Sequence, residues 1–173
     1  MASSSSRQNN VRDGAFSQTS PESRRVESST SPRLFDVFIN HHGPDVKATL
    51  ALHLYNSLQS EGFRAFLDCK EIELGELFPS TIESAISSSL VHIAIFSKGY
   101  VQSDWCLDEL TLVSKSNAEI IPVFYDVIPS DLRCIGKTKG VYADVFAEYE
   151  HSGKHIRTLE KWKESLLFHS LVI

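Results

Sequence analysis

The chain has 173 residues and a formal net charge of −5 at pH 7, a length that suits one domain with a complete hydrophobic core and some chain left over. Subtracting the net +2 of residues 1–33 leaves −7 on the rest. This acidic balance argues against a phosphate-binding surface and against nucleic acid as the main partner.

The first 33 residues contain ten serines and five arginines but almost no bulky apolar side chains. Such a segment cannot bury enough surface to offset the entropy lost on ordering, so we expect residues 1–33 to form a disordered tail. Its composition fits a protein of the cytoplasm or nucleus, and chloroplast import is the alternative interpretation. The chain has no run of about 18 apolar residues, so we expect no membrane partner.

Four short segments are rich in Val, Ile and Phe, which is the composition of buried strands. They cover residues 34–40, 64–68, 91–97 and 120–125. Between and after them, apolar residues recur at helical spacing, as Leu50, Leu54 and Leu58 do. This periodicity predicts helices over residues 46–58, 81–88, 103–114, 142–150 and 156–168.

The alternation of strands and helices predicts an α/β fold. We expect a flavodoxin-like three-layer sandwich, with a central parallel sheet of four to five strands and helices on both faces. The apolar residues 171–173 leave open whether a fifth strand forms. Ligands of such sheets bind at the carboxyl ends of the strands, where we expect the loops 40–45, 69–79, 98–104 and 126–138 to meet.

The run Ser-Asp-Trp-Cys-Leu-Asp-Glu-Leu at residues 103–110 begins a predicted helix at that edge. Trp105 and Glu109 are four positions apart and therefore share a helix face. An aromatic surface beside a lone carboxylate suits a ring-bearing substrate on which positive charge develops, so this run is the candidate reaction centre. The spacing also fits a plainer interpretation, a buried tryptophan next to a solvated glutamate.

Other motifs give no support for a nucleotide, metal or disulfide site. The run 136–138 resembles the end of a P-loop, but Asp131 stands where that motif requires its first glycine. His41 and His42 are neighbours in an extended segment and face opposite sides, and no third ligand is spaced to complete a metal site. We expect one of them to line the pocket. The three cysteines form no Cys-x-x-Cys pair, and Cys106 is expected in the core.

From Leu34 to about Phe168, the chain resembles a plant Toll/interleukin-1 receptor (TIR) domain in five motifs that occur in the family's order. They are the first strand at 35–40, the BB loop at 66–76, the third strand and its exit at 94–100, the αC signature at 105–110, and the fourth strand with its following loop at 121–133. This resemblance implies a TIR domain at residues 34–170. A TIR-only protein and a truncated product both fit the sequence.

The resemblance implies a reaction. Many plant TIR domains cleave the nicotinamide–ribose bond of NAD+ and so act as NAD+ glycohydrolases of the ADP-ribosyl cyclase type, whose ADP-ribose products serve as immune signals in plant defence. By this resemblance Glu109 is the catalytic residue. The residues implied in substrate binding are Trp105, Ser103, His41, His42, Gly43 and Lys47. NAD+ is then the substrate, and neither a cofactor nor a metal is implied.

This chain departs from the family pattern around the expected phosphate contacts. Residues 41–45 read His-His-Gly-Pro-Asp where the family usually has Phe-Arg-Gly-Glu-Asp, and Lys47 stands in place of a later arginine. The fixed guanidinium fork is therefore lost at His42. In the BB loop, Leu74 stands where an arginine usually precedes the glycine, Gly75.

The resemblance also implies homo- or hetero-oligomers with other TIR domains. His53 matches a family position for self-association, and Gly75 belongs to the BB loop, which family members place over a neighbour's active site. Because the phosphate contacts are altered, a second hypothesis stays open. In it, the protein is a non-catalytic TIR adaptor or decoy that acts through TIR–TIR association alone.

Overall fold

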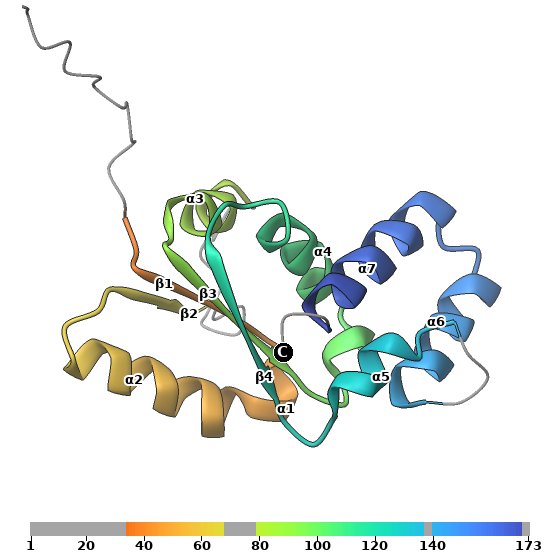
Figure 1. The fold of residues 1–173 in the computed structure, drawn as a ribbon, viewed down its shortest axis with the longest axis horizontal. Coiled ribbons are helices and arrows are strands. Elements are labelled where there is room, and N and C mark those ends of the chain that lie inside the picture. Colours follow the sequence, from red (N-terminus) through yellow and green to blue (C-terminus); the bar gives the residue numbers. More distant parts are fainter. Residues whose placement is uncertain (1–33, 68–78, 137–139, 171–173) are drawn as a thin grey trace, which may run out of the picture.

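The computed structural model describes residues 34–67, 79–136 and 140–170 (Figure 1). The predicted tail, Leu74 and Gly75 of the BB loop, and the apolar residues 171–173 lie outside the described residues. Within the part that is described, no helix is long and apolar enough to cross a membrane.

A four-stranded parallel sheet forms the centre of the structure (Figure 1). Its strands are β1 (Val37–His41), β2 (Ala65–Leu67), β3 (Val91–Phe96) and β4 (Glu119–Phe124), in the order β2-β1-β3-β4. Val37 lies opposite both Ala65 and Val91, and Ile93 lies opposite Ile121. The predicted strands and their parallel arrangement are confirmed.

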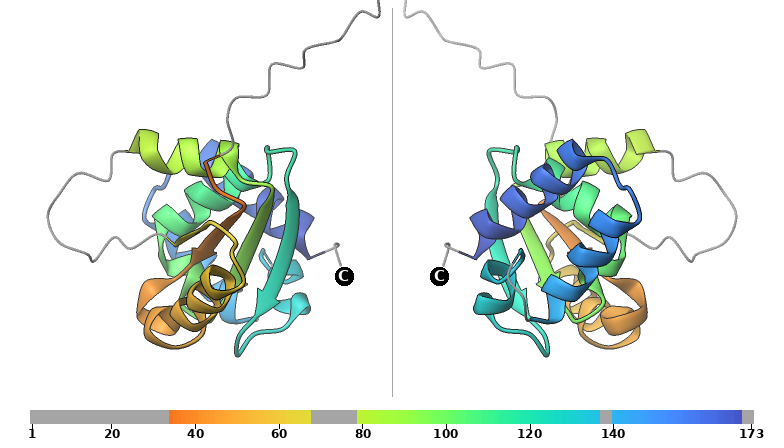
Figure 2. Two further views of the ribbon diagram at one scale, coloured as in Figure 1. Left: turned by 90° about the vertical axis from the view of Figure 1, so that its left-hand side faces the viewer. Right: turned by 90° about the vertical axis from the view of Figure 1, so that its right-hand side faces the viewer.

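Helices cover both faces of the sheet, which confirms the predicted three layers (Figure 2). One face carries α1 (Gly43–Val46), the π-helical η1 (Lys47–Ala51) and α2 (Leu52–Ser60). The other face carries α3 (Pro79–Ser88), α4 (Asp104–Val113) and α7 (Ile156–His169). The 3₁₀ turn η2 (Tyr100–Gln102), α5 (Pro129–Arg133) and α6 (Val141–His151) contribute to the same core as α4 and α7.

The alternation of side chains along the strands explains how both faces are filled. In β1, Val37 and Ile39 belong to a core cluster against which Leu54 and Leu58 of α2 pack. Phe38, between them, belongs to a different cluster that contains Ile82 of α3. In β3, Phe96 joins the largest cluster, which is shared with α4 and α7.

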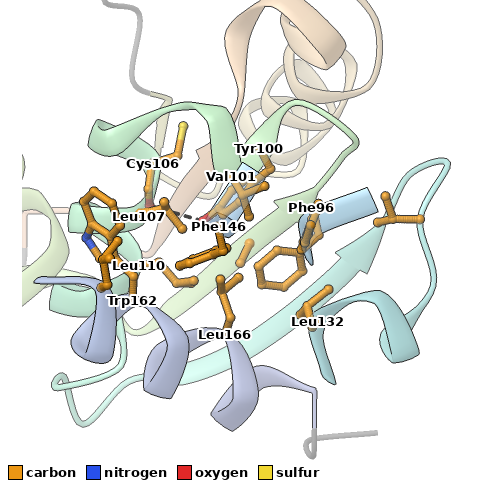
Figure 3. Packing of buried hydrophobic residues seen from close by; sticks show 14 residues of the cluster. Phe96, Tyr100, Val101, Cys106, Leu107, Leu110, Leu132, Phe146, Trp162 and Leu166 are labelled. Carbon is orange, nitrogen blue, oxygen red and sulfur yellow. Dashed lines mark hydrogen bonds between the residues drawn. The ribbon is translucent and has the colours of Figure 1, made fainter. Parts of the chain in front are cut away.

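The largest cluster holds α4 against α7 (Figure 3). Leu107 and Leu110 of α4 are fully buried, as are Trp162 and Leu166 of α7. The indole Nε1 of Trp162 donates a hydrogen bond of 2.8 Å to Asp108 Oδ1 on α4. Because apolar packing and this polar contact act together, the orientation of α4 about its own axis is fixed.

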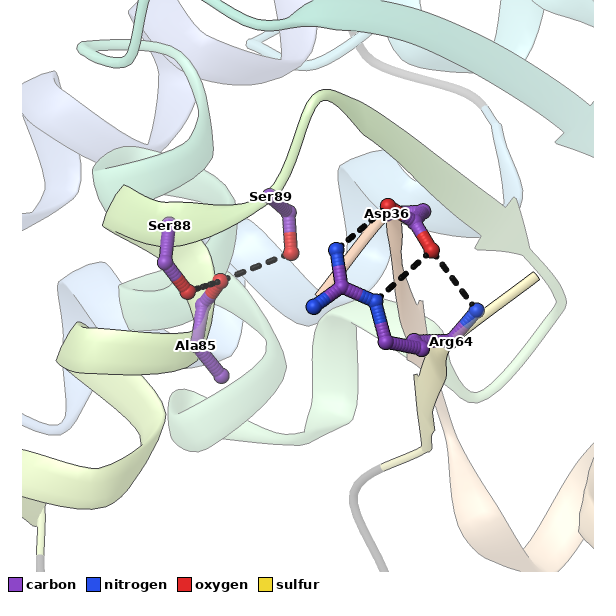
Figure 4. A network of polar contacts seen from close by, with 5 residues as sticks. All are labelled: Asp36, Arg64, Ala85, Ser88 and Ser89. Carbon is purple, nitrogen blue, oxygen red and sulfur yellow. Dashed lines mark hydrogen bonds and ion pairs between the residues drawn. The ribbon is translucent and has the colours of Figure 1, made fainter. Parts of the chain in front are cut away.

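Polar contacts fasten the amino-terminal end of the sheet (Figure 4). The guanidinium and the backbone N–H of Arg64 each donate a hydrogen bond of 2.8 Å to the Asp36 carboxylate. The Arg64 side chain is the main reason why the pKa of Asp36 is lowered, to about 2. At the end of α3, the hydroxyls of Ser88 and Ser89 donate to the carbonyl of Ala85. These contacts hold the segments that lead into β1, β2 and β3.

The first helical segment begins earlier than predicted, at Gly43 instead of residue 46. Pro44 lies in the first turn, where its preset φ and missing N–H cost nothing. His42 precedes the helix with an extended backbone. The predicted loop 40–45 is therefore half helical.

Two further features differ from the predictions. Residues 129–133, expected in a loop, form α5, which is stabilised where Asp131 Oδ2 accepts a hydrogen bond of 2.9 Å from the Ile128 N–H.

β4 has the composition of a buried strand, yet it is an edge strand of the described sheet and Ile121 is 44% exposed. Pro122 in β4 suits an edge strand, since it has no N–H to donate.

Two buried histidines are expected to make the fold sensitive to mild acid. His92 on β3 and His169 at the end of α7 are fully buried, and burial lowers the pKa of both. Below the ordinary histidine pKa of about 6.5, the unfolded chain binds protons that the native chain does not, so stability falls as the pH falls. Urea unfolding between about pH 6.5 and 5 is expected to lose up to about 1.4 kcal/mol per pH unit for each histidine.

The variant His92→Gln tests this assignment. Its free energy of unfolding is expected to depend less steeply on pH than that of the wild type, whatever its absolute stability, because one titrating group is gone. The exposed His151 gives a matched control, and His151→Gln is expected to keep the wild-type slope. If His92→Gln also keeps that slope, the buried histidine is not the source of the acid sensitivity.

Candidate functional site

The strand order creates a switch point at the carboxyl ends of β1 and β3. The chain leaves β1 toward β2 on one side and leaves β3 toward β4 on the other side. Segments that follow two such adjacent strands diverge, which makes this position the usual ligand site of an open α/β sheet. Asn40 and His41 end β1, and residues 97–103 connect β3 to α4. The candidate run 103–110 therefore starts at the switch point.

Ser103 begins α4. Its backbone is extended, and its Oγ accepts a hydrogen bond of 3.3 Å from the Cys106 N–H, so it is the N-cap of the helix. Cys106 is buried in the core, as predicted. Its thiol donates to the carbonyl oxygen of His41 over 3.3 Å. These contacts fasten the first turn of α4 to the end of β1.

Glu109 lies further along α4 and is buried, with 4% of its surface exposed. The plainer interpretation of a solvated glutamate is therefore wrong. Glu109 Oε2 accepts a hydrogen bond of 2.7 Å from Asn40 Nδ2. Asn40 is itself fully buried, and its Oδ1 accepts a hydrogen bond from the Tyr100 hydroxyl. A carboxylate in such a place interacts strongly with any positive charge that develops beside it.

Trp105 lies on the same side of α4, one turn before Glu109. Its half-buried ring packs against the cluster that contains Phe38 of β1 and Ile82 of α3. Phe38 and Asn40 share a face of β1 because they are two positions apart. Trp105 therefore packs on the side of the sheet to which Phe38 and Asn40 point, and Glu109 binds Asn40 on that same side.

A second group of side chains surrounds the start of α1. The Nδ1 atom of His42 lies 3.2 Å from Asp45 Oδ1. Asp45 Oδ2 accepts a hydrogen bond of 2.7 Å from the Gly99 N–H. Burial acts to raise the pKa of Asp45, but hydrogen bonds from Ser97, Gly99 and His42 together lower it. Lys47 follows in η1, where its side-chain carbon Cδ lies 3.9 Å from the place of a Cβ on Gly43.

Close packing leaves little room for a side chain at position 99. A Cβ there would lie 2.7 Å from the His42 ring and 2.9 Å from Asp45 Oδ2, which is nearer than real Cβ contacts come. The backbone of the loop after β3 therefore lies directly against the His42–Asp45 pair. This contact joins the segment after β1 to the segment after β3.

His41 is placed apart from the carboxylate. It is the last residue of β1, buried, and opposite Ile95 on β3. Strand alternation directs it to the face opposite that of Asn40 and Glu109. Among the described residues, no three His, Cys, Asp or Glu side chains gather as a metal site.

Comparison with known proteins identifies the family. A family model described as TIR domain matches residues 34–169. The chain belongs to the TIR domain family. It is 35% identical over 144 residues to TMV resistance protein N of Nicotiana glutinosa. This alignment covers 80% of this chain and 12% of that protein. It is 46% identical over 98 residues to the probable 2' cyclic ADP-D-ribose synthase BdTIR of Brachypodium distachyon, covering 57% of this chain and 44% of that protein. The chain thus spans less than half the length of these two relatives.

The fold of this TIR domain also matches a solved assembly. The TIR domains in the structure of the activated Roq1 resistosome, which directly recognises the pathogen effector XopQ, superpose with a TM-score of 0.71 and 34% identity. The match covers 80% of this chain and 85% of that chain. The flavodoxin-like α/β architecture predicted from the sequence is the TIR fold.

The positions expected to mediate self-association lie away from the switch point or outside the described residues. His53 is exposed on α2, next to Leu52, which is 43% exposed. Gly75 lies outside the described residues. The described part of the TIR domain therefore presents one of the two expected association positions.

Four residues of this site escaped sequence reasoning: Asn40, Asp45, Gly99 and Tyr100. Asn40 offered one usable signal, since it is a polar residue at the end of an apolar strand segment. The other three offered no signal, because their roles come from contacts between distant parts of the chain. The hydrogen bond from Tyr100 to Asn40 spans 60 residues, and that from Gly99 to Asp45 spans 54.

Replacing Gly99 with alanine is expected to destabilise the TIR domain by about 1–3 kcal/mol, because the new methyl group overlaps the His42 ring and the Asp45 carboxylate. Gly43→Ala is the matched control, since its Cβ meets Lys47 at an ordinary contact distance of 3.9 Å. That control is expected to change the free energy of unfolding by less than about 0.5 kcal/mol. Denaturant unfolding measures both variants, and equal losses would contradict the close approach at Gly99.

Proposed function

We propose that this TIR domain is an NAD+ glycohydrolase that cleaves the nicotinamide–ribose bond and produces ADP-ribose-type signals in plant defence. One observation carries the proposal: the buried carboxylate of Glu109 is held by Asn40 at the switch point between β1 and β3. The similarity to BdTIR, whose name describes a probable 2' cyclic ADP-D-ribose synthase, supports the same class of reaction. NAD+ is the substrate, and the proposed chemistry needs no separate cofactor.

The proposed reaction begins when the bond between ribose C1′ and the nicotinamide nitrogen breaks. Its electron pair goes to the ring, nicotinamide leaves as a neutral molecule, and positive charge develops on the ribose. Water then adds at C1′ and a proton is released, which yields ADP-ribose. Attack by a hydroxyl of the same nucleotide gives a cyclised product instead. O-glycosidases use two carboxylates, one of them to protonate the leaving oxygen, whereas a neutral leaving group needs no such acid.

Glu109 supplies the single carboxylate that this reaction requires. It binds the ribose hydroxyls and offsets the oxocarbenium charge, an interaction that grows as the bond breaks and therefore lowers the barrier. Burial of the carboxylate supports this role, because water screens its charge less in a buried site. The rigid attachment of α4 to α7 keeps the carboxylate in place as the charge develops.

The remaining substrate contacts are proposed on both sides of this carboxylate. Trp105 and Ser103 shape the pocket from α4. His41, His42, Gly43 and Lys47 are proposed to contact the substrate from the end of β1 and the start of α1, with His41 on the face of the sheet opposite Glu109. His42 and Lys47 are proposed as the basic contacts of the substrate phosphates.

Self-association is proposed to accompany the reaction. The Roq1 structure, which contains TIR domains of a resistosome, supports assembly as a property of related TIR domains. In this chain, His53 on α2 and Gly75 of the BB loop are the proposed positions. The enzyme is proposed to work in the cytoplasm or nucleus.

One observation favours the adaptor hypothesis. The Asp45 carboxylate lies 3.2 Å from the imidazole of His42, so its negative charge repels a phosphate group that approaches His42. If this repulsion prevents NAD+ binding, the TIR domain acts through TIR–TIR association alone.

The conservative variant Glu109→Gln tests the reaction. Its amide oxygen can still accept the hydrogen bond from Asn40, so the fold is expected to persist, but the loss of the negative charge is expected to lower NAD+ consumption by at least about a hundredfold. The matched control Glu119→Gln changes an exposed glutamate at the opposite edge of the sheet and is expected to keep the wild-type rate. Chromatography of the nucleotide products over a range of protein concentrations measures the rates. Equal, negligible turnover in wild type and Glu109→Gln at concentrations that permit assembly would favour the adaptor.

The variant His42→Arg separates the two hypotheses further. A guanidinium stays charged beside Asp45 and offers a fork of donors to a phosphate group. We therefore expect the KM for NAD+ to fall by about tenfold, which corresponds to about 1.4 kcal/mol of added binding. The lysine variant His42→Lys carries the charge without the fork and is expected to give a smaller effect. If neither variant changes the KM of an active enzyme, His42 is not a phosphate contact.

A further inference from the structure

We propose that Asn40 is the positioning residue of Glu109, and that Tyr100 fixes the direction of the Asn40 amide. The inference rests on the proposed function, because it assigns a role in presenting the carboxylate that cleaves NAD+. It concerns a chain of hydrogen bonds that runs from η2 through the central strand β1 to α4.

The contact between Asn40 and Glu109 is short and protected. Asn40 Nδ2 lies 2.7 Å from Glu109 Oε2, and the two residues are 0% and 4% exposed. A hydrogen bond to an ionised partner in such a place is stronger than one between neutral groups. The donor therefore favours one rotamer of the glutamate and also its charged form.

Asn40, the donor of this hydrogen bond, lies on a strand that is held on both sides. β1 is paired on both sides, with β2 and with β3, and Asn40 lies opposite Ala94 of β3. A side chain on a central strand moves less than one on a loop. The position of Asn40 in the sheet therefore fixes where the Glu109 carboxylate lies.

Tyr100 determines which end of the Asn40 amide faces Glu109. An amide presents an oxygen at one end and an NH₂ group at the other, and the oxygen would repel the carboxylate. The Tyr100 hydroxyl donates to Asn40 Oδ1 and so leaves Nδ2 for Glu109. Burial, with smaller contributions from Cys106 and Glu109, raises the pKa of Tyr100, so its hydroxyl remains a donor.

The first turn of α4 adds a third point of attachment. The carbonyl oxygen of Cys106 lies 3.5 Å from Asn40 Nδ2 and 3.3 Å from the Tyr100 hydroxyl. The titratable groups that act on Tyr100 are Cys106, Glu109 and Tyr142.

The experiment uses Tyr100→Phe and Asn40→Asp in the full chain, with Tyr142→Phe as the matched control. Tyr142 is also fully buried and donates its hydroxyl to a carbonyl, that of Ser97 at 2.8 Å, so this control loses a comparable hydrogen bond that does not reach Glu109. The side-chain carboxyl carbon of Glu109 is followed by ¹³C NMR as the pH is varied. The resonance that is missing from Glu109→Gln identifies it.

We expect the titration midpoint of Glu109 to move to higher pH in Tyr100→Phe, where the amide loses its fixed direction. It is expected to move further in Asn40→Asp, which replaces a donor with a second carboxyl group. Tyr142→Phe is expected to leave the midpoint unchanged. In NAD+ turnover, the first two variants are expected to lose roughly ten- to a hundredfold in kcat with little change in KM, since a misplaced catalytic group costs rates of this order.

The two readouts separate failure of this inference from failure of the proposed function. If the midpoints shift as expected but the wild type does not cleave NAD+, Asn40 still positions the carboxylate and the proposed reaction is wrong. If the wild type cleaves NAD+ and Glu109→Gln does not, yet Tyr100→Phe and Asn40→Asp keep the wild-type midpoint, the inference is overturned. A midpoint that shifts equally in Tyr142→Phe overturns it as well, because general destabilisation then explains the result.

Discussion

The hydrogen bond between Asn40 and Glu109 is the contact on which the arrangement of the site depends. It joins the central strand to the helix that follows the neighbouring strand, across 69 residues of sequence. A carboxylate buried without a donor would be costly enough to take up a proton or to leave the core. The amide of Asn40 supplies a donor of this kind at the switch point of the sheet.

The packing of α4 against the helix behind it supports this contact. Helix α4 carries Ser103 as its cap, the Asn40-bound glutamate on one side, and Leu107 and Leu110 on the side that packs against α7. The hydrogen bond from Trp162 to Asp108 helps to fix the rotation of α4 relative to α7. Apolar burial supplies the free energy that holds α4 to the sheet, and the few buried polar contacts determine its rotation.

Much of the fold follows from the sequence because its causes are local. Strand composition and helical spacing predict all four strands, the helices between them and the α/β class, and the spacing of Trp105 and Glu109 predicts that they share a face. The exposed edge at β4 does not follow, since its apolar composition matches that of the inner strands. The burial of Glu109 does not follow from the sequence either, because a helical pattern does not reveal which polar residue meets a polar partner.

By itself the sequence determined the order of the four strands and of the helices between them, the start of a helix at residue 103 and the motifs that resemble a TIR domain. Only the tertiary structure placed Asn40 against Glu109, Tyr100 against Asn40 and Gly99 against the His42–Asp45 pair. The reason is physical. Periodicity and capping act over three or four residues, whereas these contacts join residues that meet only after the parallel strands have brought distant segments to one edge of the sheet.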